Sequence, residues 1–90
     1  MTNNGSISPE DIIPDGVDNI SINGTIVRKG TVAAFLANAK VLEHQYSTEI
    51  QKNEAIKTMK ELAPAIIATG LHQHVVFKNK VVEQILIDAE

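Results

Sequence analysis

Hydrophobic and polar residues alternate in the segment from Ile20 to Val27, and Asn23-Gly24 lies at its centre. Alternation with a period of two is typical of a β-strand that buries one face. Asn-Gly favours a type I′ turn, because both central residues of that turn need positive φ. The pattern therefore predicts a β-hairpin in which Ile20, Ile22 and Val27 share the buried face.

A second pattern begins directly after the hairpin, where the residues from Val32 to Leu42 are apolar except for Asn38 and Lys40. This segment is predicted to be a helix with Thr31 as its N-cap. Its apolar residues form two stripes on different sides of the helix. The first stripe consists mainly of large side chains. The second consists of small ones: Ala33, Ala34, Ala37 and Val41.

The stripe of small residues would let another backbone approach closely. In the simpler interpretation, it contacts another helix of this chain. In the alternative, a second copy of the chain covers it, because a chain of this length has few elements with which to bury both sides of a helix. We expect this stripe to be the interface of a homo-oligomer, most simply a homodimer.

The longest helical pattern follows a predicted capping box formed by Thr48 and Gln51. Apolar residues then recur at helical spacing as far as Ile66, and polar residues occupy the opposite side. Pro64 falls on the polar side, where water can satisfy the hydrogen bond that it removes, so a bend or a restart is expected there rather than an end. Gly70 is predicted to stop the helix.

The C-terminal part is predicted to add a third strand and a last helix. The segment from His74 to Phe77 is rich in β-forming side chains and is too short for a helix between its flanking turn signals. We interpret it as a strand, with a loop as the open alternative. Asn79 is then predicted to cap a helix that extends to Ala89.

These elements predict the fold class. Near the N-terminus, Ser8 and Pro9 indicate one helical turn. The whole pattern indicates a single α+β domain over residues 8–90, preceded by a disordered tail over residues 1–7. An antiparallel sheet of two or three strands packs against three helices in the order β-β-α-α-β-α, in which the third strand is the one expected near residues 74–77.

Composition restricts the classes of function. Eight lysines and arginines against 11 acids give a formal net charge of −3, which disfavours binding to nucleic acid. The absence of cysteine excludes disulfides and cysteine-ligated metals. The chain begins without the pattern of a secretory signal, and its apolar runs are far shorter than the roughly 20 residues of a membrane span. We expect a cytoplasmic protein without nucleic-acid or membrane partners, of a composition typical of small bacterial proteins.

His72 and His74 are the candidate metal ligands. Alternate residues of a strand point to the same side, so two imidazoles with Cα atoms about 7 Å apart could chelate one ion. Glu43 or His44 could add a ligand only if the helix that precedes them returns to that edge. The alternative interpretation is a pair of exposed polar residues, because two ligands are fewer than a site needs.

Arg28, Lys29, Gly30 and Thr31 form a candidate anion site. They combine two cations, a glycine and a hydroxyl at the predicted start of a helix, where free amides attract anions. An ordinary turn from strand to helix has the same composition. Because neither a phosphate-binding loop nor a dinucleotide fingerprint is present, no cofactor is expected.

Catalytic patterns are not evident in the sequence. It contains neither the Gly-x-Ser-x-Gly nor the His-Glu-x-x-His motif, and none of its serines has a neighbouring base. We therefore expect a small non-catalytic protein that acts as a homo-oligomeric interaction module. A module that binds small anions at residues 28–31 and a metal-binding protein that uses residues 72 and 74 are the alternatives.

Overall fold

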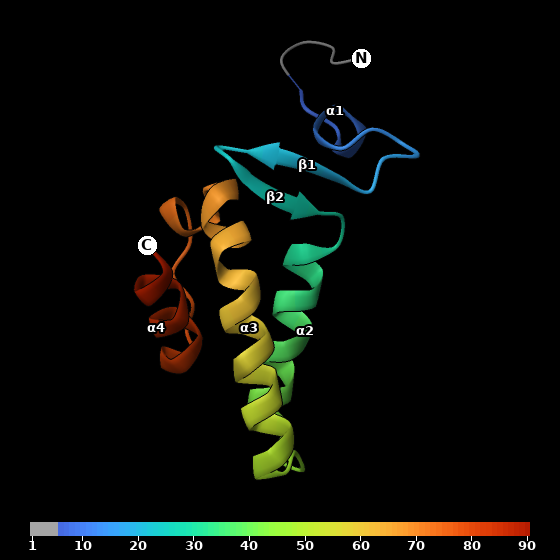
Figure 1. The fold of residues 1–90 in the computed structure, drawn as a ribbon. Coiled ribbons are helices and arrows are strands. Elements are labelled where there is room, and N and C mark those ends of the chain that lie inside the picture. The colour runs from blue at the N-terminus through green and yellow to red at the C-terminus, as the bar shows by residue number, and fades with distance from the viewer. Residues whose placement is uncertain (1–5) are drawn as a thin grey trace.

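A computed structural model describes residues 6–90, so most of the tail predicted over residues 1–7 lies outside the described residues. Helices and one two-stranded sheet make up the described part, which confirms the α+β class (Figure 1). The helices are α1 (Pro9–Ile12), α2 (Thr31–Glu43), α3 (Glu49–Thr69), the 3₁₀ helix η1 (Leu71–Gln73) and α4 (Lys80–Ala89), and the strands are β1 (Asn19–Ile22) and β2 (Thr25–Arg28).

The predicted hairpin is confirmed in its register and its faces. β1 pairs antiparallel with β2, and Ile20 lies opposite Val27. The two turn residues have the positive φ that the turn requires, 50° at Asn23 and 81° at Gly24. Val27 is buried, whereas Ile26 on the other face is 59% exposed. The hairpin lies across the ends of α2 and α3 (Figure 1). The burial of Val27 shows that its predicted face is turned inward.

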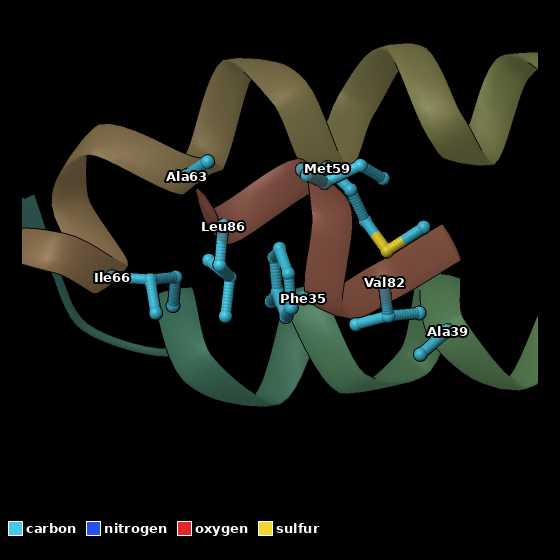
Figure 2. Close-up of a cluster of buried hydrophobic side chains, with 8 residues drawn as sticks. Phe35, Ala39, Met59, Ala63, Ile66, Val82 and Leu86 are labelled. Carbon is cyan, nitrogen blue, oxygen red and sulfur yellow. The ribbon is translucent and has the colours of Figure 1, made fainter. Parts of the chain in front are cut away.

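The main core lies among α2, α3 and α4. Figure 2 shows Phe35 of α2 between Leu86 and Val82 of α4, with Met59 of α3 beside Val82, and the residues Phe35, Met59 and Val82 have an exposed fraction of 0%. The ring of Phe35 meets that of Phe77 edge to face, with centroids 5.9 Å apart. Because α3 contacts α2, α4 and β2, it is the element that joins the layers of the fold.

The predicted ends of α3 are confirmed. At its start, the Gln51 N–H donates to Thr48 Oγ1 at 3.1 Å, and the Thr48 N–H donates to Gln51 Oε1 at 2.8 Å, which completes the capping box. The helix continues through Pro64, whose side is exposed. Gly70 ends it in the left-handed conformation, with φ 82°.

The predicted third strand over residues 74–77 is wrong. After η1, the N–H groups of His74 and Val75 both donate to the Leu71 carbonyl, at 3.0 and 3.2 Å, so they cannot contribute to a sheet ladder. The Phe77 N–H donates instead to Glu83 Oε1 at 2.9 Å. The segment leads back along the helices to the start of α4, and the C-terminus returns to the level of η1 (Figure 1).

In residues 6–90, none of the helices combines the length and the apolar character needed to cross a membrane. Even α3, the longest helix, carries charged residues along its exposed side before Pro64.

Candidate interaction surface

The small-residue stripe lies on the side of α2 that faces away from the core. Three residues of α2 are buried: Thr31, Phe35 and Ala39. On the outer side, Ala33, Ala34 and Ala37 are exposed and Val41 is half-buried; we call these four residues the alanine face. The helices of this chain leave the three alanines exposed and cover Val41 only in part, so packing against another helix of the same chain does not account for most of the face.

Larger apolar side chains continue this surface on both sides. Val32 and Leu36 flank the alanine face and are 37% and 40% exposed. On its other side, a groove of about 520 Å³ separates the end of α2 from the start of α3. Ile50 and Tyr46 line this groove and are 76% and 80% exposed. The apolar surface therefore extends from the start of α2 to the turn that follows it.

Tyr46 belongs to a turn with defined internal contacts. Its N–H donates to Nδ1 of His44 at 3.2 Å, and the two rings lie with centroids 5.8 Å apart. The Ser47 N–H also donates to the His44 carbonyl at 3.0 Å. These contacts fix the backbone of the turn, while the tyrosine ring projects into solvent. Sequence analysis missed this residue, although an aromatic ring in an otherwise polar turn was the available signal.

The predicted anion-binding residues line a second groove. This hairpin groove, of about 390 Å³, lies between α1, the hairpin and the start of α2. Aliphatic residues from all three elements line it, among them Ile12, Ile22 and Val32. Two cationic and two acidic residues are also among the residues that line it, namely Arg28, Lys29, Glu10 and Asp15.

Arg28 and Lys29 are both exposed, and neither forms an ion pair with another residue of the described part. The Lys29 N–H donates to the Asp18 carbonyl at 2.8 Å and so prolongs the pairing of the two strands. An exposed cation can bind a carboxylate, a phosphate or the face of an aromatic ring.

Thr31 has a different role from the one predicted. The N-cap of α2 is Gly30, with φ 80°, and Thr31 is the first residue of the helix. Its hydroxyl donates to the Arg28 carbonyl at 2.7 Å, and only 7% of the residue is exposed. The prediction of Thr31 as the N-cap is therefore wrong, because this hydroxyl joins the helix to β2 instead of receiving the helix N–H groups.

We expect Thr31→Val to lower the free energy of unfolding by about 1 kcal/mol, because the Arg28 carbonyl loses a part-buried donor while the shape of the side chain is kept. Urea denaturation followed by circular dichroism measures this difference. Thr31→Ser keeps the hydroxyl and serves as the control, with most of the stability retained. Equal stability of the valine variant and the wild type would contradict this role.

The candidate metal ligands do not lie on a strand. His72 is in η1, and its Nε2 atom lies 3.3 Å from Oε2 of Glu90. His74 is exposed in the turn after η1, and Glu43 accepts a hydrogen bond of 3.4 Å from the Asn79 amide. Within residues 6–90, no three side chains of the metal-ligating types come together as a site. The geometry on which the metal prediction depended, alternate residues of one strand, is therefore absent.

Comparison of the chain with protein-family models, with curated proteins and with solved structures found no match.

Proposed function

We propose that this protein is a non-catalytic interaction module that forms a homodimer through the alanine face of α2. One observation carries the proposal: α2 is apolar on two sides, and its own chain covers only the side that holds Phe35 and Ala39. Small side chains such as Ala37 allow two helix axes to approach to roughly 8 Å, which brings the flanking Leu36 and Val41 side chains into contact as well. A contiguous exposed apolar patch on a folded chain is a feature of association sites.

The total surface of the chain supports the same proposal. The chain exposes 6471 Å², whereas a compact monomer of this mass exposes about 5,200 Å². Its radius of gyration is 14.6 Å, against about 12 Å for a compact chain of this length. The excess surface, about 1,300 Å², is larger than the roughly 800 Å² that one partner contributes to a standard interface. A dimer of standard size through α2 would therefore bury part of this excess surface.

We further propose that the module acts in the cytoplasm, where a chain without cysteine loses nothing to the reducing environment. Its function would then be to form the homodimer.

Ala37→Glu is expected to convert the dimer to a monomer, because each glutamate would lie at the centre of the contact against its own symmetry copy. Light scattering on a sizing column measures the mass, with the wild type expected at twice the monomer mass of 9.8 kDa. The helical signal should remain, since Ala37 is exposed and points away from the core.

Asn53→Glu is the matched control for this experiment. It adds the same charge at an exposed position of α3, away from the alanine face. We expect this variant to remain a dimer. A wild type that is monomeric at every concentration, or an Ala37→Glu variant as dimeric as the control, would refute the proposed function.

A further inference from the structure

We propose that the outer edge of β1 binds an extended segment of a partner protein, both basic and apolar, which adds a third strand to the sheet. Every second side chain of that segment would enter the hairpin groove beside the edge. The contact does not involve the alanine face, so it is independent of the proposed dimer. It gives the module a site for a second protein.

The pairing of the two strands leaves four backbone groups of β1 directed away from β2. In an antiparallel pair, opposite residues alternate between hydrogen-bonded and non-hydrogen-bonded positions. The Lys29 N–H donates to the Asp18 carbonyl at 2.8 Å, so Ile20, two residues further along, also bonds to β2. The N–H and carbonyl groups of Asn19 and Ser21 therefore point outward. Within residues 6–90 these four groups have no hydrogen-bond partner, and both residues are exposed.

The outer edge of β2 is less available than that of β1. The Arg28 carbonyl points outward from β2 but accepts the Thr31 hydroxyl at 2.7 Å, and α3 contacts this strand. Edge strands are commonly protected from further pairing by lysine, proline or a bulge. The sequence of β1, Asn-Ile-Ser-Ile, has neither of these residue types, and its register with β2 is continuous. β1 is therefore the edge that can accept another strand.

The hairpin groove lies on the inward face of the sheet beside this edge. Ile20 and Ile22 of β1 line it, and Ile12 of α1 lines it as well. Side chains of an added strand would alternate between the two faces of the sheet. Every second one would then lie on the face of Ile20 and Ile22, at the groove. In this mode of recognition, backbone hydrogen bonds supply affinity and the groove selects apolar side chains.

The charge around β1 indicates a basic partner. Residues 6–27 contain neither lysine nor arginine. They contain four acids, namely Glu10, Asp11, Asp15 and Asp18. Two of these, Glu10 and Asp15, line the groove itself. The summed field of these acids attracts a segment that carries lysine or arginine.

The two cationic residues that line the groove do not reverse this charge. Strand alternation places the Arg28 side chain on the Ile26 face of β2, away from the groove. Lys29 lies opposite Asp18, whose carbonyl accepts the Lys29 N–H. Both cations also belong to the end of β2, on the far side of the sheet from the open edge.

A second copy of this chain is the less favoured occupant of the edge. Two β1 strands paired about a two-fold axis would bring two acidic segments together, and their like charges oppose the contact. With Asn19 opposite Ser21 of the partner subunit, Ile22 would lie opposite Asp18 of the partner subunit. That pairing places a carboxylate against an apolar side chain.

The probe is a short fluorescent peptide in which lysine and valine alternate and both ends are blocked. By fluorescence anisotropy, we expect the wild type to bind it about tenfold or more tightly than the same peptide with glutamate in place of lysine. Two further forms carry backbone N-methyl groups, one on its lysines and the other on its valines. Only one of these sets of N–H groups faces β1 in an added strand. One methylated form should therefore bind about tenfold or more weakly, and the other should stay within about threefold.

Ser21→Pro tests the edge from the side of the protein. It removes the outward N–H of residue 21, while the hydrogen bonds of Ile20 and Ile22 to β2 remain. We expect the dissociation constant for the lysine peptide to rise about tenfold or more. Ser21→Ala keeps the N–H and should stay within about threefold of the wild type. Circular dichroism checks the fold of both variants. If Ser21→Pro does not fold, the two methylated peptides decide the question on the wild type.

The outcomes separate this proposal from the proposed dimer. The lysine peptide failing to bind the wild type, both methylated forms binding like the parent peptide, or an unchanged dissociation constant for folded Ser21→Pro would overturn it. A loss of mass in Ser21→Pro by light scattering would assign the edge to a second copy and would also overturn it. A monomeric wild type that binds the lysine peptide with the expected methylation pattern would refute the dimer and support the edge site.

Discussion

Phe35→Ala is expected to lower the free energy of unfolding by about 3–5 kcal/mol. The ring has an exposed fraction of 0% and contacts Phe77 edge to face. Its neighbours Met59 and Val82 belong to two different helices, so the cavity left by the ring cannot close by the shift of one side chain. A chain of 90 residues is stabilised by about 5–13 kcal/mol in total, and this one substitution would remove a large part of it. Urea denaturation followed by circular dichroism gives the value.

Val76→Ala is the control for this substitution, since Val76 is apolar but 80% exposed and its truncation should change the stability by less than about 0.5 kcal/mol. The mass of folded Phe35→Ala should remain that of the wild type, because Phe35 lies on the side of α2 opposite Ala37. A loss below about 1 kcal/mol would show that the core among the three helices is not packed as described.

The parts of the fold that the sequence predicts correctly are those fixed by local conformation. Asn23-Gly24 specifies a turn with two positive φ values, and the alternation around it determines which face of the hairpin is buried. The capping box of Thr48 and Gln51 and the left-handed Gly70 likewise involve neighbours within a few residues. Such features need no knowledge of the rest of the chain.

The segment from His74 to Phe77 shows where local reasoning fails. Its β-forming residues fit a strand, but its conformation is determined by distant contacts. Phe77 packs against Phe35, and the Phe77 N–H is bound by Glu83 from α4. In residues 6–90 the sheet consists of β1 and β2 alone, so this segment pairs with neither strand. These contacts depend on how α4 docks, which the local pattern does not encode.

The prediction of Thr31 as the N-cap of α2 failed for a different reason. Gly30 and Thr31 are both acceptable N-caps by residue type, and threonine is preferred by frequency. The positive φ of Gly30 places it at the cap, and the Thr31 hydroxyl then finds the Arg28 carbonyl. Residue type alone therefore does not decide whether Gly30 or Thr31 is the N-cap. The path of β2, which precedes them, decides it.

The candidate surface was predictable in part. Helical periodicity alone identified the alanine face, because a period of 3.6 assigns every residue to a side. The projecting Tyr46 and the hairpin groove required the three-dimensional arrangement, since α1, the hairpin and α2 form the groove from segments that have no common pattern in the sequence.

Met59→Glu is expected to prevent folding. The side chain has an exposed fraction of 0% and lies in α3, between α2 and α4, where every neighbour in the core is apolar. A carboxylate there would have no partner, and burying an unpaired charge costs several kcal/mol in addition to the lost packing. That cost is comparable with the whole stability of a chain of this length. Far-UV circular dichroism at 25 °C should show loss of most of the helical signal.

Met59→Leu is the control, because it conserves volume and apolar character and should cost less than about 1.5 kcal/mol. Comparison with Ala37→Glu is the sharper test of which apolar residues belong to the core and which belong to the exposed alanine face. Both variants add a glutamate to a helix of the same bundle, yet Ala37 is exposed and Met59 is not. We expect the glutamate at position 37 to leave the helical signal intact while it abolishes the dimer. If that variant unfolded as Met59→Glu does, the alanine face would be part of the core of the folded chain, because only a buried position loses the fold to a single charge.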